Sequence, residues 1–184
     1  TALDLGIQLI AISDHNASAN VAAVQQSALG TSLTVLPGME VQTNEEVHVL
    51  CIFDTIDQLK RWQSRIDQSS PFIENNIEFF GEQFVVDETG DFLRRESRLL
   101  LTSTGLSLET VVSEVHALGG LAIPAHIDRK SFGLIANLGF VPEGLPVDAL
   151  EISRFCSPQQ AASTFPQVCG YPLIQNGDVH RLDE

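Results

Sequence analysis

Basic residues are scarce in this sequence: ten lysines and arginines stand against 24 aspartates and glutamates, for a formal net charge of −14 at pH 7. Proteins hold a long nucleic-acid backbone largely through Lys and Arg, which displace condensed counterions. A chain this acidic has no large basic surface, so we expect it to bind no long nucleic acid. The same acidity suits a site that gathers carboxylates around divalent cations, whose charge the formal count omits.

Cysteine is also scarce, and long hydrophobic runs are missing. The three cysteines, Cys51, Cys156 and Cys169, show no C-x-x-C spacing and make a poor framework for disulfides. No stretch approaches the roughly 20 apolar residues of a membrane span, and residues 1–15 lack the basic segment that opens a signal peptide. We therefore expect a cytoplasmic protein with no membrane partner. The sequence does not indicate an oligomeric state.

The chain has 184 residues, 43% of them hydrophobic, which is enough for one core, so we expect a single domain over 1–184. Short apolar runs at 7–13, 33–36, 47–53, 121–125, 147–152 and 172–175 alternate with helical spacing at 16–29, 56–66, 107–118 and 158–164. Runs that are apolar on both faces are typical of a parallel sheet covered by helices. This predicts an α/β fold, either an open sheet or a (β/α) barrel.

Two local features interrupt this alternation. The run at 33–36 is expected to end at Pro37-Gly38, because this dipeptide is typical of a turn. The interval of about 67–105 is irregular and contains a turn signal at 87–90, so we expect an inserted helix and hairpin there. The basic cluster at 94–98 is expected on an exposed face of this insertion.

Histidines and carboxylates gather at the ends of the predicted strands. The histidines at these positions are His15, His48, His126 and His180, and the carboxylates beside them are Asp14, Glu40 and Asp178. In parallel α/β folds, strand-end loops meet on one face, so we expect these side chains to converge. Imidazole and carboxylate together suit Zn, Mn or Fe better than Ca, and a closed structural zinc site would contain Cys. His116 falls inside a predicted helix and is expected to be structural.

Five motifs make this pattern resemble a known family. They are GIQLIAISDHN at 6–16, PGMEVQT at 37–43, EVHVLCIF at 46–53, GGLAIPAHIDR at 119–129 and NGDVH at 176–180. In this order they are similar to the D-H-[ND], G-x-E, His-containing strand, A-H-P and D-x-H motifs of the polymerase and histidinol phosphatase (PHP) family. Ile127 stands where the family usually has Pro, and Gly177 stands where it usually has Ser.

The resemblance implies a distorted (β/α)7 TIM-like barrel of the PHP type, with two or three divalent ions at the carboxyl-end mouth. Carried over residue by residue, Glu40 bridges two ions, His48 and His126 complete the shell of one, Asp178 binds the other, and His15 with His180 holds a third. Asp14 is expected to orient His15 rather than to bind metal.

The family also has an H-x-H motif on its first strand, which this sequence does not contain. We therefore expect a fragment that lacks the first strand and the final helix. Because H-x-H supplies two ligands of the Asp178 ion, the fragment alone is expected to be nearly inactive.

The implied function is hydrolysis of a phosphate ester by a metal-activated water, with a mononucleotide, a short oligonucleotide or a small-molecule phosphate as substrate. Arg129 is the expected phosphate contact, because a guanidinium matches phosphate oxygens in pairs, and Arg154 and Arg181 are alternatives. Two other functions stay open. One is a non-catalytic PHP module that serves as an interaction scaffold, and the other is a metal-dependent amidohydrolase, whose barrel also carries His and Asp at strand ends.

Overall fold

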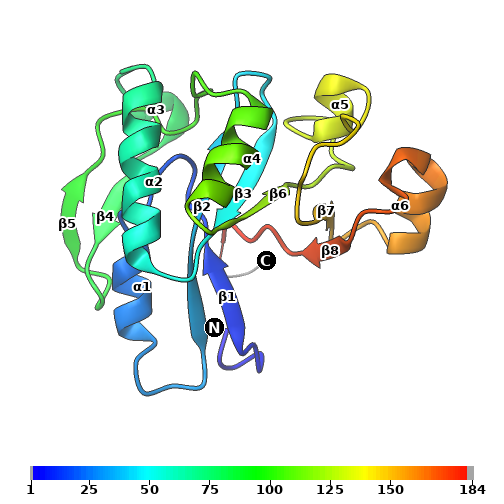
Figure 1. The fold of residues 1–184 in the computed structure, drawn as a ribbon. Helices are drawn as coiled ribbons and strands as arrows, with labels where there is room; N and C mark the ends of the chain where they lie inside the picture. The colour runs from blue at the N-terminus through cyan, green and yellow to red at the C-terminus, as the bar shows by residue number, and fades with distance from the viewer. Residues whose placement is uncertain (1, 182–184) are drawn as a thin grey trace.

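The computed structural model describes residues 2–181 and arranges them as an α/β fold. Strands β1 (Leu9–Ile12), β2 (Thr34–Gln42), β3 (His48–Ile52) and β6 (Leu121–Pro124) form one sheet in the order β1-β2-β3-β6 (Figure 1). Strands β7 (Leu150–Ser153) and β8 (Leu173–Asn176) form a parallel pair. Strands β4 (Phe84–Val86) and β5 (Phe92–Arg95) form a separate antiparallel hairpin.

The helices are α1 (Val21–Ser27), α2 (Ile56–Ser69), α3 (Ile77–Phe80), α4 (Leu108–Ala117), α5 (Leu134–Leu138) and α6 (Pro158–Thr164). Side chains of Thr55, Ser107 and Ser157 accept hydrogen bonds from backbone N–H groups in the first turns of α2, α4 and α6. Within residues 2–181, none of the helices is both long and apolar enough to cross a membrane.

One face of the four-stranded sheet packs against α2 and α4. Successive strand residues point to opposite faces, and the apolar set of β2 and β3 joins the apolar faces of the two helices. This core contains Met39, Val41, Val49 and Cys51 from the strands, Leu59, Trp62 and Ile66 from α2, and Val111, Val112 and Val115 from α4. The opposite face of the sheet carries Glu40, Gln42 and His48, which are all buried. Helix packing on one face therefore leaves the other face for polar chemistry.

The sheet is mixed, so the expectation of parallel strands throughout is wrong. Strands β1 and β2 are parallel, but β3 runs antiparallel to both β2 and β6. The reason is the connection of residues 43–47, which turns at Glu46 with a φ of 62°. A parallel crossover needs about a dozen residues or more, so a connection of this length can only join antiparallel neighbours.

The expected closed (β/α)7 barrel is not seen in the described part of the chain. Two hydrogen bonds place β7 beside β6: Asp148 N–H donates to the Ala122 carbonyl (3.1 Å) and Ile127 N–H donates to the Glu151 carbonyl (2.9 Å). The strands thus follow one another in an open arc from β1 to β8. Small barrels close with about eight strands, and the arc has only β1, β2, β3, β6, β7 and β8.

The turn expected at Pro37-Gly38 is also wrong, because β2 runs straight through it. Pro37 is the last partner of β1, opposite Ile12, and Gly38 is the first partner of β3, opposite Ile52. Proline has no N–H to donate. It is tolerated inside β2 because the strand changes its pairing partner here, from β1 to β3. The Pro37 carbonyl still accepts a hydrogen bond from Phe53 N–H (2.8 Å).

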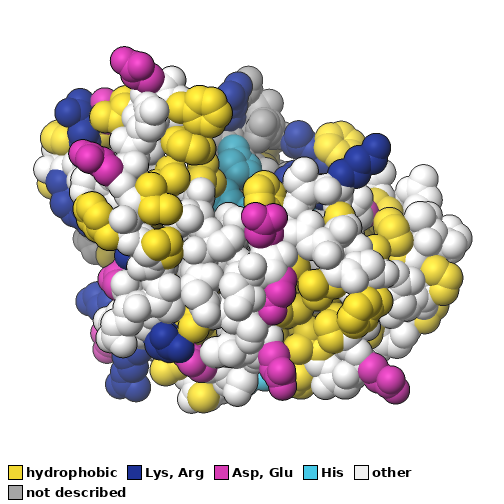
Figure 2. Space-filling model, turned by 90° about the horizontal axis from the view of Figure 1, so that it is seen from above, with side chains coloured by type: hydrophobic (Ala, Val, Ile, Leu, Met, Phe, Trp, Pro, Cys, Tyr) yellow, Lys and Arg dark blue, Asp and Glu magenta, His cyan; other side chains and the backbone are white. Residues whose placement is uncertain are grey.

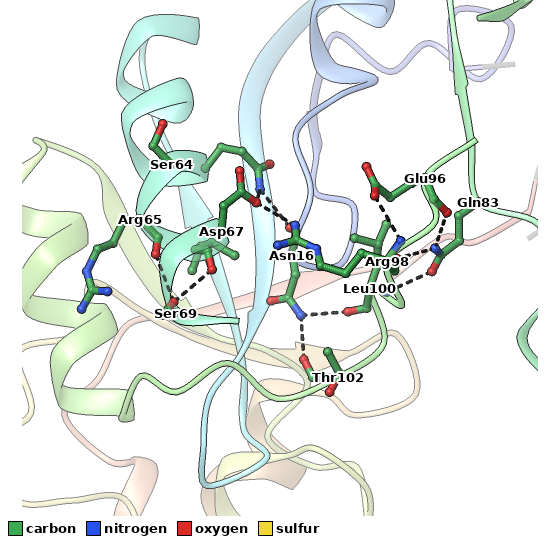
Figure 3. A network of polar contacts seen from close by, with 12 residues as sticks. Asn16, Ser64, Arg65, Asp67, Ser69, Gln83, Glu96, Arg98, Leu100 and Thr102 are labelled. Carbon is green, nitrogen blue, oxygen red and sulfur yellow. Dashed lines mark hydrogen bonds and ion pairs between the residues drawn. The ribbon is translucent and has the colours of Figure 1, made fainter. Parts of the chain in front are cut away.

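Asn16 ties the loop after β1 to segments distant in the sequence (Figure 3). Its side-chain nitrogen donates to the carbonyls of Leu100 (2.8 Å) and Thr102 (2.7 Å), and its side-chain oxygen accepts from Gln42 N–H (3.2 Å). Asn16 is 2% exposed and has a φ of 50°, a left-handed conformation that asparagine adopts more readily than most residues. It therefore fixes the end of the loop that carries Asp14 and His15.

We predict that Asn16→Ala lowers the free energy of unfolding by about 3 kcal/mol, because three backbone groups, one buried and two partly buried, lose their hydrogen-bond partner at roughly 1–3 kcal/mol each. Urea denaturation measures this loss. Ser64→Ala on the exposed face of α2 is the control and should stay within about 0.5 kcal/mol of wild type. An Asn16→Ala protein as stable as this control would show that the network does not hold the loop.

Candidate metal centre

Backbone pairing places His15 beside Glu40. The ladder of β1 and β2 continues past the end of β1 as a bridge between these two residues. Asn16 N–H donates to the Glu40 carbonyl (2.8 Å), and Glu40 N–H donates to the Asp14 carbonyl (3.2 Å). Gly38 permits this close approach, because a Cβ atom there would lie 2.9 Å from the Ile12 carbonyl oxygen. The two side chains therefore meet as a consequence of strand register.

His48 and His126 reach the same place from β3 and from the loop after β6. Because β3 runs opposite to its neighbours, its first residue, His48, lies at the sheet edge where β2 and β6 end. Ala125 N–H donates to the His48 carbonyl (2.9 Å), which places His126 next to it in the following loop. The antiparallel strand thus delivers a histidine to the edge at which parallel strands present their carboxyl ends.

The Glu40 carboxylate lies between three imidazoles. One oxygen is 3.2 Å from His15 Nδ1, and the other is 3.2 Å from His48 Nδ1 and 3.4 Å from His126 Nε2. Ligand atoms of His15, Glu40 and His48 all lie within 4.8 Å of one another. The two oxygens of one carboxylate therefore face different imidazoles, as they would if the carboxylate bridged two ions.

Asp178 and His180 border this cluster. The His180 ring centroid is 5.9 Å from that of His15, and His180 Nδ1 is 3.5 Å from an Asp178 carboxylate oxygen. Arg129 forms an ion pair with Asp178 and remains 41% exposed. The structure thus brings together all six side chains that the sequence suggested as ligands, with Arg129 at the rim.

The other predicted residues lie elsewhere. The Asp14 carboxylate accepts a hydrogen bond from Asn20 Nδ2 (3.2 Å) and lines a neighbouring cavity of about 210 Å³, so its hydrogen bond is directed to the start of α1. His116 pairs with Asp148 at 2.8 Å, away from the cluster. In the 94–98 segment each arginine is paired with a carboxylate: Arg94 with Glu96, Arg95 with Glu82 and Arg98 with Asp67.

The cluster shifts the pKa values of its members in opposite senses. Burial alone would raise the pKa of Glu40, but the adjacent imidazoles of His126, His48 and His15 outweigh burial and hold that pKa well below its ordinary value. Burial lowers the pKa of His15, although Glu40 partly opposes the change. At neutral pH the centre therefore combines a charged carboxylate with a neutral His15 imidazole, which are the protonation states that metal ligands require.

The donor atoms fit a divalent cation of the Zn, Mn or Fe class. Both ring nitrogens of His48 and Nδ1 of His126 are buried and make no hydrogen bond with any described residue. The contact between His48 Nδ1 and Glu40 is close but not directed as a hydrogen bond. Buried polar atoms are rarely left in this state, and a cation among them would satisfy several at once.

Glu151 is a site residue that the sequence analysis missed. It lies on β7, is 2% exposed and accepts a hydrogen bond from Asn176 Nδ2 (3.1 Å). Burial raises its pKa, while the Asn176 hydrogen bond and the nearby His126 oppose the change. The signal for it in the sequence was an acidic residue within the apolar segment ALEI at 149–152, because a buried strand rarely contains a carboxylate.

Comparison with solved structures shows where this fold occurs. No protein-family model and no curated protein matches the sequence. A protein from Bifidobacterium adolescentis described as a metal-dependent phosphoesterase is similar over all of this chain and 81% of its own, with a TM-score of 0.63 and 17% identity. The lesion-specific endonuclease PfuEndoQ from Pyrococcus furiosus is similar over 95% of this chain, with a TM-score of 0.60 and 16% identity. An amidohydrolase from Chromobacterium violaceum is similar over 89% of this chain and 73% of its own, with a TM-score of 0.53 and 18% identity.

These similarities confirm the α/β fold and, at the level of fold, the resemblance to PHP-type proteins. The chain spans 40% of the length of the Pyrococcus endonuclease. The three neighbours are hydrolases by description, and their identities below 20% leave the chemistry of this chain to be argued from its own residues.

The expectation that net charge excludes long nucleic acids is wrong. Endonuclease Q, which has this fold, forms a complex with a 27-mer duplex whose abasic lesion lies at the active site. A net charge sums the whole surface, whereas a scissile phosphate meets only the local field, and cations bound among carboxylates change the sign of that field. The charge of −14 therefore does not decide the substrate class.

We predict that Glu40→Gln weakens Zn²⁺ or Mn²⁺ binding by more than about 100-fold, beyond the roughly 10- to 100-fold typical of losing a group that only orients a ligand. The amide keeps the shape but loses the charge that offsets two cations. Isothermal titration of the metal-free chain measures the affinity. Glu88→Gln, at the exposed tip of the β4–β5 hairpin, is the matched control and should bind as wild type does. Equal affinities of the two variants would return Glu40 to a structural role.

We also predict that Glu151→Gln stabilises the metal-free chain at pH 7 and has less effect near pH 4. The folded-state pKa of Glu151 is raised, so its ionisation destabilises the fold above the ordinary glutamate pKa of about 4.3, and that penalty disappears as the pH falls below it. Urea denaturation at both pH values, with Glu88→Gln as control, measures the difference. A Glu151→Gln protein that is less stable than wild type at pH 7 would show that the charged form is favoured.

Proposed function

We propose that this chain carries the metal-binding part of a metal-dependent phosphoesterase. The observation that carries the proposal is the position of Glu40. Its two carboxylate oxygens face different imidazoles, and those of His48 and His126 have unsatisfied ring nitrogens. The fold shared with an endonuclease and with a protein described as a metal-dependent phosphoesterase supports it. The proposed ligands are His15, Glu40, His48, His126, Asp178 and His180, holding two or three ions of Zn, Mn or Fe.

When bound, such ions activate water near neutral pH and offset the negative charge that develops on the phosphoryl oxygens. The side chains of the protein position these ions. Glu40 would hold such ions through both carboxylate oxygens, because one oxygen faces His15 and the other faces His48 and His126. The left-handed backbone at His126 (φ 32°) and Asp178 (φ 48°) aims two ligands into the site at a conformational cost that the surrounding structure must offset.

Arg129 is proposed to bind the substrate phosphate. It lies three residues after His126, its side chain is 41% exposed, and its partner Asp178 belongs to the proposed ligand cluster. Cation binding by Asp178 would compete with this ion pair, and the released guanidinium could then bind two phosphate oxygens. Arg154, by contrast, lies 5.1 Å from the ring centroid of Phe155, and a cation–π contact already accounts for its position.

The proposed substrate class includes the phosphodiesters of nucleic acids. Endonuclease Q acts on a DNA duplex, and the Chromobacterium protein binds sulfate, a tetrahedral anion of the same shape as phosphate. A second candidate is amide hydrolysis, because that sulfate-binding neighbour is an amidohydrolase by description. The two reactions differ in the atom that water attacks, which is phosphorus in a phosphodiester and the carbonyl carbon in an amide. An assay with both kinds of substrate therefore distinguishes them.

We predict that the complete gene product, loaded with Mn²⁺ or Zn²⁺, hydrolyses a phosphate ester and that His126→Gln lowers kcat at least about 100-fold, equivalent to roughly 2.7 kcal/mol of transition-state stabilisation. The reason is the loss of one imidazole from a buried ligand set. The assay follows phosphate or alcohol release from a monoester, a dinucleotide and an N-acyl amide.

His116→Gln is the matched control, because His116 pairs with Asp148 outside the cluster, and it should retain wild-type turnover. Near-normal turnover by His126→Gln, or turnover of the amide alone, would contradict the proposal.

A further inference from the structure

A second pocket, of about 490 Å³, opens beside the metal centre and shares His48 with it. Its volume lies in the range of small-molecule sites, roughly 300–1,000 Å³. Two phenylalanines, Phe80 and Phe132, line it together with polar side chains that include Gln42 and Ser103. On the face shown in Figure 2, histidine side chains lie in a recess flanked by hydrophobic side chains. A group held in this pocket would lie next to any phosphate bound at the ions.

Phe132 is fixed in the pocket by a strained loop. Its φ of 57° is unfavourable for a bulky residue, and its carbonyl accepts a hydrogen bond from His48 N–H (3.0 Å). Its ring stacks on the His48 imidazole, with centroids 4.6 Å apart and planes 8° apart. The next residue in the chain is Gly133. A side chain would not fit there, because a Cβ atom would lie 2.6 Å from the Arg129 carbonyl oxygen. Strain of this kind persists where the surroundings impose it, and it points to a functional position for the ring.

Both aromatic rings remain available to a ligand. Phe132 is 39% exposed although it stacks on His48, and Phe80 is 42% exposed at the end of α3. Phe80 is supported by an edge contact with Phe79, with centroids 4.7 Å apart. Phenylalanines that pack in a hydrophobic core are buried, whereas these two are exposed in a pocket that also contains buried polar groups. Their ring faces can therefore stack on a planar group.

The polar lining indicates what kind of planar group would fit. Gln42 is buried and donates to Ser103 Oγ (3.0 Å), and the carboxylate of Glu46 also lines the pocket. No Lys or Arg is among the described residues that line it, so the pocket has no ammonium or guanidinium group to pair with a phosphate. It offers hydrogen-bond donors and acceptors around aromatic rings instead. This combination suits a neutral heterocycle with a polar edge.

We propose that this pocket binds the nucleobase adjacent to the scissile phosphate, and hence that the substrate is a nucleotide or a nucleic-acid strand. The proposal rests on the proposed phosphoesterase function and names its substrate class. Stacking on Phe132 and Phe80 would hold the base, and Gln42 and Ser103 would contact its edge. Stacking tolerates different bases, because every base has a π-face.

The test measures binding of two probes to the metal-loaded chain: a phosphorothioate trideoxynucleotide, which resists hydrolysis, and the same oligomer with abasic residues. Phe132→Leu and Phe80→Leu should each weaken binding of the base-bearing oligomer by about tenfold, the order of one lost base–aromatic stack. Binding of the abasic oligomer should not change. Phe72→Leu, an equally conservative change at a 77% exposed ring outside the pocket, should bind both as wild type does.

Metal affinity is measured on every variant, because the Phe132 ring stacks on His48 and a change there can also alter the metal site. A tenfold effect of Phe80→Leu at unchanged metal affinity would support the base site. Equal binding of base-bearing and abasic oligomers by wild type, or no effect of Phe80→Leu, would overturn it and leave the phosphoesterase proposal standing. Absence of metal-dependent binding of either oligomer would count against both proposals.

Discussion

The constraint on which the site depends is the burial of one carboxylate. Glu40 is 5% exposed in the middle of the sheet, and an isolated ionised group in such a place costs several kcal/mol. The structure offsets that cost by surrounding the carboxylate with imidazoles from three separate segments. Each of these segments has to be held in register, and much of the architecture around the sheet edge serves that purpose. A cation at this position would complete the compensation, because it would place a full positive charge beside the carboxylate.

Four features of the structure hold His15 and His48 beside Glu40. The close approach permitted at Gly38 lets the β1–β2 ladder bring His15 beside Glu40. The reversed direction of β3 brings His48 to the same edge. Asn16 anchors the loop after His15 to residues about 85 positions away, and Phe132 supports His48 from the other side. Of the five non-glycine residues described with positive φ, Asn16, His126, Phe132 and Asp178 lie at or next to the site. Backbone strain is therefore concentrated where ligands are aimed.

The sequence predicted much of this arrangement where the signal is local. The apolar runs and the alternation of strands with helices follow from short-range physical chemistry. The structure places α4, β6 and α6 within the predicted intervals, and β7 and β8 each end one residue beyond them. The convergence of the six candidate side chains was likewise predictable, because strand ends meet at one edge. The direction of β3 was misjudged although the short connection at 43–47 was visible, and Pro37 was interpreted as a turn because its pairing depends on neighbours on both sides. Glu151 and Phe132 were missed because their importance comes from contacts with distant residues.

The most direct test of the account is a crystal of the chain grown with Mn²⁺ or Zn²⁺ and measured at the absorption edge of the metal. The account predicts an anomalous peak between the Glu40 carboxylate and at least two of His15, His48 and His126, with ligand distances of roughly 2.0–2.2 Å. A second peak on the side of the other Glu40 oxygen would identify the carboxylate as a bridge. An empty site at saturating metal, with Glu40 still packed among the three histidines, would contradict the claim that this cluster is a metal centre.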